Sequence, residues 1–341
     1  MKTPLSPKKW VVTVAVLSLL CVIAGFAAIS IGTTPIKPWD FWTSIGSEDH
    51  VWIARILDYR FRRALLAAMI GAGLAAAGGG FQAILRNPLA EPYLLGVMGG
   101  GALGAVVALA LNITGMAARP IAAFLGSIVS MSLVWVVARG GGKTGPRSHN
   151  LLLAGVIVNA FFAGIIMFAT SVMGAHQVKS FLFWMMGDLS SERSPGWLLF
   201  VGVYIAVGLA FILPQARDYN LLALGEDSAQ QLGANTGRVK LMTYIGACIV
   251  TAACVSVAGL IGFVGLIVPH TIRLAIGPDH RLLLPSCVLG GAFFLVICDT
   301  MARTAFPVSE IPIGAVTAFF GGPFFLWLLR RRGTTSFPEE S

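Results

Sequence analysis

Long apolar runs, separated by short polar segments, follow one another along nearly the whole chain. Ten such runs of 17 to 23 residues can be distinguished. At a rise of about 1.5 Å per residue, each is long enough to cross a hydrocarbon core of about 30 Å as a helix. They cover residues 10–31, 65–85, 93–111, 121–138, 151–173, 197–213, 241–258, 260–276, 282–301 and 313–329. The pattern predicts an all-α, polytopic membrane protein with about ten transmembrane helices in a single domain, residues 1–341.

Composition supports a membrane protein and argues against soluble and nucleic-acid-binding classes. Hydrophobic residues make up 56% of the chain and charged residues only 11%, against about 25% charged residues in soluble domains. The formal net charge of +9 does not indicate nucleic acid, because most basic residues lie in short loops between apolar runs, where membrane lipid attracts them. All five cysteines fall within apolar runs and form no CxxC pair. We therefore expect no disulfide framework, no metal site and no cofactor.

The basic residues also predict how the chain is oriented in the membrane. With the N-terminus in the cytoplasm, 15 of the 24 lysines and arginines lie on the cytoplasmic side, in agreement with the positive-inside rule. Ten crossings then place both termini in the cytoplasm. The first run has 22 residues, more than the about 7–15 of a signal-peptide core, which favours an uncleaved first helix.

Residues 139–145, RGGGKTG, look like the end of a phosphate-binding P-loop. A complete P-loop needs a further glycine five positions before Gly142, and Val137 stands there. The flanks are also membrane-length apolar runs and not a strand and a helix. We therefore expect a flexible basic loop, and any ATP that this protein requires would bind to another chain.

Residues 214–240 form the longest predicted cytoplasmic segment. Leu221, Leu222 and Leu224 precede Gly225, and Glu226 and Asp227 open a second short turn that ends at Gly233. This pattern predicts two short amphipathic helices with a glycine joint. The segment either caps the helix bundle or forms a small protruding surface that binds a cytoplasmic protein, and the pattern fits both.

Arginines cluster on the predicted outer side, between Arg55 and Arg63. They either reach towards lipid headgroups or form a docking site for an acidic partner. On the same predicted outer side, the aromatic stretch 181–186, FLFWMM, is too short to span the membrane and predicts an interfacial or re-entrant helix.

Few polar residues stand within the apolar runs. Asp299 and Arg303 are four residues apart and can pair on one helix face. His270 is interpreted as a packed polar residue and not as a metal ligand, because no second ligand stands at helical spacing.

The second and third runs are rich in glycine, with Gly71, Gly78, Gly96, Gly100 and Gly104 among them. Glycines give smooth faces on which helices approach closely. Such faces suit static packing, and they also suit helices that slide past one another during alternating access.

Six stretches, in their order and spacing, resemble the permease subunit of FecCD-type ABC importers, which carry iron-siderophores, haem or cobalamin. They are RFRRALLAAMIGAGLAAAGGGFQAILRNPLAEPYLLGVMGGGALGA at 60–105, LLLAGV at 151–156, FWMMG at 183–187, LALGEDSAQQLG at 222–233, GLIGFVGLIVPHTIRLAIGPDHRLLLP at 259–285 and ARTAFPVSEIPIGAVTAFFGGPFFLWLL at 302–329.

The resemblance implies three sets of site residues. Segment 222–233 is similar to the family's coupling helices, which sit in a groove of the ATPase dimer, and the residues concerned are Leu224, Gly225, Glu226, Ser228, Ala229 and Leu232. Positions at which family permeases meet acidic residues of a substrate-binding protein correspond to Arg60, Arg63 and Arg303. The cytoplasmic gate corresponds to Asn87, Leu89, Ser148 and His149, although the glycine-rich loop 139–150 departs from the family pattern.

The expected function is therefore that of a transport subunit that carries out no bond chemistry. The resemblance implies a homodimer in the bacterial inner membrane, two copies of a separate ABC ATPase and a periplasmic binding protein, together importing a bulky metal chelate. An ion-coupled secondary transporter is the alternative, but it would normally place carboxylates at mid-membrane, where the ten runs have almost none. An intramembrane enzyme is disfavoured because HExxH and GxSxG motifs are absent from the sequence.

Overall fold

The computed structural model describes residues 6–332 apart from 35, 47–48, 114, 116, 141–145, 147, 191–194 and 307–309. For 327–329 and 331–332 it describes the backbone alone. Most of the predicted basic loop 139–145 therefore lies outside the described residues. All regular structure in the described part is helical.

Each of the ten apolar runs overlaps a helix. Within the described residues, seven helices are long and apolar enough to cross a membrane, and Val97–Ala110, Val264–Ile276 and Ile313–Leu326 are shorter apolar ones. The helices are α1 (Pro7–Ser30), α2 (Asp40–Thr43), α3 (His50–Ile84), η1 (Pro92–Leu95), α4 (Val97–Ala110), α5 (Ala118–Arg139), α6 (Ser148–Val172), α7 (Ala175–Met185), α8 (Pro195–Ile212), η2 (Leu213–Gln215), α9 (Ala216–Leu222), α10 (Glu226–Gln231), α11 (Thr236–Ala258), α12 (Val264–Ile276), α13 (His280–Thr304) and α14 (Ile313–Arg332).

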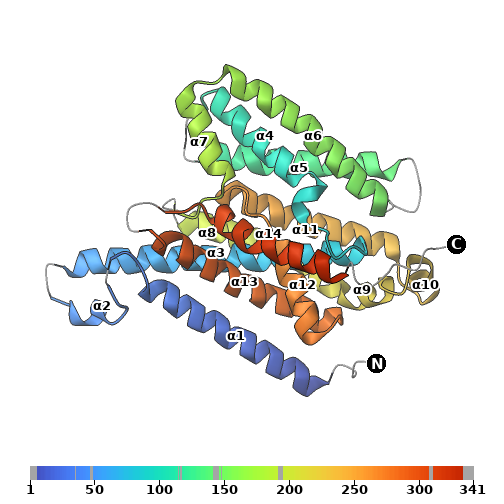
Figure 1. The fold of residues 1–341 in the computed structure, drawn as a ribbon, viewed down its shortest axis with the longest axis horizontal. Coiled ribbons are helices and arrows are strands. Elements are labelled where there is room, and N and C mark those ends of the chain that lie inside the picture. The colour runs from blue at the N-terminus through green and yellow to red at the C-terminus, as the bar shows by residue number, and fades with distance from the viewer. Residues whose placement is uncertain are drawn as a thin grey trace.

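The centre of the bundle is built around α3. This helix packs against α13, α11 and α12, and α11 in turn packs against α8 and α5. In α3 and α11, 78% of the most apolar stretch is buried within the chain, against 11% in α1. Accordingly α1 lies at the edge, against α13 and α3, while α4 to α7 form a second group on the other side (Figure 1).

The two ends of the bundle carry different elements. The start of α1, the end of α14 and the short helices α9 and α10 lie together at one end, and α2 lies at the opposite end (Figure 1). This arrangement places the predicted coupling helices at the same end of the bundle as the start of α1 and the end of α14.

Glycines set the closest helix contacts, as the sequence predicts. A Cβ atom added to Gly71 of α3 would strike the carbonyl oxygen of Gly291 in α13. One added to Gly78 would strike the carbonyl oxygen of Gly265 in α12. Gly100 of α4 meets α5 backbone in the same way. These contacts are backbone to backbone, so no side-chain adjustment can relieve an added methyl group.

Two apolar runs are interrupted where the sequence suggests continuous helices. The eighth run begins at residue 260, but its helix starts only at Val264, after a non-helical connection that includes Gly259 (φ 69°) and Phe263 (φ 68°). The third run is broken at Gly96 (φ 97°), between η1 and α4. At about 1.5 Å per residue, the 13 residues of α12 extend about 20 Å, less than a hydrocarbon core of about 30 Å.

The aromatic stretch 181–186 belongs to a helix that begins earlier than predicted. α7 starts at Ala175, after Gly174, and its 11 residues are too few to cross a membrane. Phe181 and Trp184 are buried, whereas Phe183 is exposed. The stretch is therefore helical with one buried face, and its place relative to the membrane surface stays a prediction.

Candidate coupling, gate and docking sites

The coupling segment, residues 214–240, has the two short helices that the sequence predicts. α9 and α10 are joined at Gly225, whose φ of 119° suits glycine far better than any other residue. Ala229, on the inner face of α10, is fully buried, whereas Leu224 and Leu232 are 64% and 59% exposed. Two exposed leucines at this end of the bundle thus leave apolar side chains open to a partner.

Hydrogen bonds from α9 fix the coupling segment to the bundle. The hydroxyl oxygens of Tyr219 and Thr243 are 2.6 Å apart, which ties α9 to α11. The Asn220 amide donates to Asp279 Oδ1 at 2.8 Å, just before α13. Hydrogen bonds from Arg281 and then from Asn220 hold the pKa of the Asp279 carboxyl well below its usual range, so this link is ionised at neutral pH.

A buried ion pair joins α10 to α11. Lys240 Nζ lies 2.8 and 2.7 Å from the two carboxylate oxygens of Glu226, the first residue of α10. The side chain of Lys240 is only 3% exposed, against 39% for Glu226. The same ammonium lies 3.4 Å from the carbonyl oxygen of Pro146.

The two predicted gate segments lie next to each other. Asn87 Oδ1 accepts a hydrogen bond from the Leu89 amide at 2.9 Å, which shapes the turn after α3. At the start of α6, the Ser148 hydroxyl donates to the carbonyl oxygen of Ile84 at 3.1 Å. The structure therefore brings Ser148 to the end of α3, whereas the neighbouring His149 is exposed. Their role as a gate stays a prediction.

The three arginines predicted for docking are buried within this chain. Arg60, Arg63 and Arg303 are 4%, 5% and 7% exposed. Arg60 donates to the carbonyl oxygens of Ile29, Thr34 and Ile36, and Arg303 donates to that of Ala28. Both side chains thus organise the C-terminal end of α1 and the backbone after it.

Arg63 is held by carboxylates from two other segments. Its Nε lies 2.9 Å from Asp299 Oδ1 on α13, and its Nη1 lies 2.8 Å from Glu310 Oε2, shortly before α14. The sequence spacing predicts that Asp299 pairs with Arg303. Asp299 Oδ2 lies 3.8 Å from Arg303 Nε, so Arg63 is the closer partner of Asp299. Glu310 is 46% exposed, and it is the member of this network that a partner can reach.

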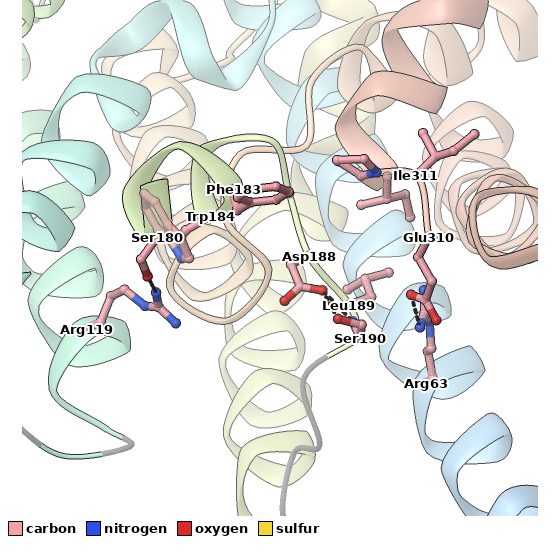
Figure 2. Close-up of a pocket in the computed structure, with 13 residues that line it drawn as sticks. Arg63, Arg119, Ser180, Phe183, Trp184, Asp188, Leu189, Ser190, Glu310 and Ile311 are labelled. Atoms are coloured by element: carbon pink, nitrogen blue, oxygen red, sulfur yellow. Dashed lines mark hydrogen bonds and ion pairs between the residues drawn. The ribbon is translucent and has the colours of Figure 1, made fainter. Parts of the chain in front are cut away.

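A pocket of about 290 Å³ opens beside this network. Figure 2 shows Arg63 with Glu310 at one edge and Arg119 at the other, with Asp188 between them. Arg119, on α5, donates to Ser180 on α7 at 3.4 Å. Opposite charges therefore alternate around a hollow that α3, α5, α7 and the residues before α14 surround. No group of three or more His, Cys, Asp or Glu residues that could hold a metal ion is found in the described ranges.

Comparison with known proteins decides the family. Residues 20–331 match the FecCD transport family. The chain belongs to this family. It is 36% identical over 323 residues to the hemin transport system permease protein HmuU of Yersinia pestis, covering 93% of this chain and 94% of that one. It is 42% identical over 274 residues to the cobalamin import system permease protein BtuC of Halobacterium salinarum, covering 80% and 72%.

A solved structure shares the fold. It is described as an inward-facing conformation of a metal-chelate type ABC transporter, with a TM-score of 0.81 and 28% identity, covering 94% of this chain and 99% of that one. Membership of the FecCD family makes the chain the permease subunit of an ABC importer. It is a transport protein and not an enzyme, and ATP hydrolysis belongs to a separate subunit.

Two residues of this FecCD permease stand out in the structure but not in the sequence. Glu91 Oε1 accepts the Phe263 amide at 2.5 Å, which links the turn after α3 to the connection before α12. Burial raises the pKa of the Glu91 carboxyl to about 7. The second residue is Lys240, whose partner Glu226 is 14 positions away, a spacing that no local pattern marks. For Glu91, a charged residue between Ala90 and Pro92 at the edge of an apolar run was the available signal.

Proposed function

We propose that this chain is one of two identical permease subunits of an ATP-driven importer in the bacterial inner membrane. Together they would move a bulky metal chelate from the periplasm to the cytoplasm. The observation that carries the proposal is the family match over residues 20–331, joined to relatives whose names give hemin, cobalamin and vitamin B12 as cargo. An iron-siderophore belongs to the same class of large metal complexes.

In the proposed orientation ten helices cross the membrane and both termini face the cytoplasm. The coupling segment then lies on the cytoplasmic side, because it shares one end of the bundle with the start of α1 and the end of α14 (Figure 1). A cysteine introduced at Ser228, an exposed residue of α10, should react with a membrane-impermeant maleimide in inverted vesicles. Labelling only from the periplasmic side would contradict this orientation.

The proposed coupling surface consists of Leu224, Gly225, Glu226, Ser228, Ala229 and Leu232. Exposed leucines at 224 and 232 supply apolar contact with an ATPase subunit. Buried Ala229 fixes α10 against the bundle, and Gly225 sets the angle between α9 and α10. Closure of two ATPase subunits around ATP would displace this surface and favour one arrangement of the permease helices over the other.

The proposed gate consists of Asn87, Leu89, Ser148 and His149, which come from the turn after α3 and the start of α6. In favour is the hydrogen bond from Ser148 to Ile84, because it joins the two segments directly. A relative movement of α3 and α6 would therefore change the spacing of these residues.

Docking of a substrate-binding protein is proposed for the outer face that Arg60, Arg63 and Arg303 organise. Since all three are buried, an acidic side chain of the partner would reach Arg63 through the pocket beside it, where it would replace the exposed Glu310. The role of Arg60 and Arg303 would be to hold the surrounding backbone in place.

Reconstitution tests the function directly. The permease is placed in proteoliposomes with its ATPase, and loaded binding protein is added outside. Uptake of haem or cobalamin should require ATP and should stop when the ATPase is omitted. Uptake that continues without the ATPase and follows an ion gradient would instead identify an ion-coupled secondary transporter.

A further inference from the structure

A buried lysine connects three segments at the cytoplasmic end of the bundle as oriented above. Lys240, near the start of α11, is 2% exposed. It donates to both oxygens of Glu226 on α10 and lies 3.4 Å from the carbonyl oxygen of Pro146, in the loop that precedes α6. These contacts span 14 and 94 positions in the sequence. One side chain therefore touches both the coupling segment and the loop that leads to Ser148.

Stability alone does not explain a charge at this position. Moving an ammonium group out of water costs several kcal/mol, and a paired carboxylate repays this only in part. An apolar residue of similar size in such a place is often neutral or stabilising. The ion pair instead fixes the geometry of the two helices, because charged hydrogen bonds hold α10 and α11 at a defined distance more strictly than apolar packing does.

The contact with Pro146 continues towards the proposed gate. Pro146 is itself buried and stands two residues before Ser148. The Ser148 hydroxyl donates to Ile84, the last residue of α3, three positions before Asn87. Contacts thus join Glu226 to Lys240 and Lys240 to Pro146. Two residues further along the chain, Ser148 contacts Ile84 at the end of α3.

The other side-chain links of the coupling segment lead elsewhere. Tyr219 contacts Thr243 within α11, and Asn220 contacts Asp279 and His280 at the start of α13. Gln230 donates to Thr236, at the start of α11. Among the residues that the structure describes, the side-chain hydrogen bonds from α9 and α10 towards the loop before α6 pass through Lys240.

We propose that Lys240 is a positioning residue that transmits displacement of α10 to Pro146, two residues before the start of α6, and so couples the ATPase to the cytoplasmic gate. The inference rests on the proposed function of the coupling segment. The two contacts of the ammonium differ in length, 2.7 Å to Glu226 and 3.4 Å to Pro146. Lys240 therefore follows Glu226 when α10 moves, and its longer contact with Pro146 is the one that changes.

The test compares Lys240→Met with Arg238→Met in proteoliposomes that contain the ATPase and loaded binding protein. Methionine keeps an unbranched stem and removes the charge. Arg238 is the matched control, because it is a basic residue on the same helix but is exposed. Uptake and ATP hydrolysis are measured together, since the ratio of transported cargo to hydrolysed ATP reports coupling and does not depend on how much protein folds.

We expect Lys240→Met to lower this ratio about tenfold while hydrolysis continues, in the range usual for coupling between sites. Arg238→Met should leave it unchanged. Glu226→Gln should lower the ratio as well, and the double variant should be no worse than Lys240→Met, because both changes break the same contact. An unchanged ratio in Lys240→Met, or additive effects in the double variant, would overturn the proposal.

A second measurement separates this inference from the function on which it rests. A photoactivatable crosslinker at Ser228→Cys reports contact between α10 and the ATPase. Crosslinking should persist in Lys240→Met. If the crosslink is lost in Lys240→Met but present in the parent protein, Lys240 merely supports docking of the ATPase, and the proposed transmission to Pro146 is wrong. If the parent protein gives no crosslink, the coupling surface itself is wrong.

Discussion

Arg63 Nε lies 2.9 Å from Asp299 Oδ1, although 236 positions separate the two residues in the sequence. The pair joins α3 to α13, which form the most extensive helix contact of the bundle. Both side chains are almost fully buried, at 5% and 2% exposure. Burial makes each charge dependent on the other, because an unpaired charge away from water is far more costly than the pair.

Asp299→Asn should therefore destabilise the protein strongly. The change removes the anion between two buried arginines, Arg63 and Arg303, and the expected loss is about 3 kcal/mol. Thermal unfolding in detergent, followed by scattering or by a thiol-reactive dye, measures it. Asp58→Asn is the control, since the Asp58–Arg62 pair is exposed and should contribute less than about 1 kcal/mol. Equal effects of the two substitutions would contradict the assignment.

Glu310→Gln tests whether Arg63 takes part in docking. Glu310 is the exposed partner of Arg63, so it competes with any carboxylate that the binding protein presents. Removing its charge should raise the affinity of the binding protein for the permease several-fold, about 1 kcal/mol, as measured by surface plasmon resonance on nanodiscs. Weaker binding would mean that Glu310 itself contacts the partner, and unchanged affinity would leave Arg63 with a structural role only.

Leu224→Asp should abolish coupling without unfolding the chain. The side chain is 64% exposed, so a charge there is hydrated in the free permease but buried in the complex. We expect affinity for the ATPase to fall about tenfold or more, with an unchanged melting temperature. Ala229→Asp provides the contrast, because Ala229 is fully buried and a charge there should lower the melting temperature. Normal ATPase binding by Leu224→Asp would contradict the proposed surface.

Gly78→Ala should destabilise the α3–α12 contact. The new methyl group would meet the Gly265 backbone, and the helices must separate at a cost of about 1–3 kcal/mol. Gly164→Ala is the matched control on α6, where a Cβ atom meets nothing within 4 Å and the better helix propensity of alanine can act. Melting temperatures of the two variants should move in opposite directions or, for Gly164→Ala, stay constant.

Glu91 should make stability depend on pH. Burial raises the pKa of its carboxyl from 4.5 to about 7, so the folded chain holds this proton more tightly than the unfolded chain does. The contribution of this carboxyl to the free energy of unfolding is fully present below about pH 4.5. It falls by up to about 3 kcal/mol as the pH rises through 7. Glu91→Gln keeps the acceptor for the Phe263 amide and should remove this dependence. Parallel pH profiles of the two proteins would contradict the shifted pKa.

Much of the helical architecture follows from the sequence, because apolar runs of membrane length leave few alternatives to helices. Each predicted run overlaps a helix, and the joint at Gly225 stands where the glycine pattern puts it. The late start of α12 could not be read in the same way. Residues 260–263 are apolar like their neighbours, and their non-helical backbone depends on hydrogen bonds from Ile261 and Phe263 to Tyr93 and Glu91.

The sites were less predictable than the helices. Motif resemblance identifies Arg60, Arg63 and Arg303, but it carries no information on burial, which depends on carbonyl groups of α1 and on Asp299. In the sequence, Lys240 stands out only as one of the basic residues on the predicted cytoplasmic side. Its contacts with Glu226 and Pro146 arise from tertiary packing, and sequence spacing cannot reveal them.

The length of α3 has a mechanical consequence. This single helix of 35 residues carries Arg63 in its first half and Ile84, the acceptor for Ser148, at its last position. The 21 positions between them correspond to about 32 Å, the thickness of a bilayer interior. If α3 tilts as a rigid body with the close Gly71–Gly291 contact as its pivot, its two ends therefore move in opposite directions. A single rotation of α3 would change the outer and inner faces at the same moment.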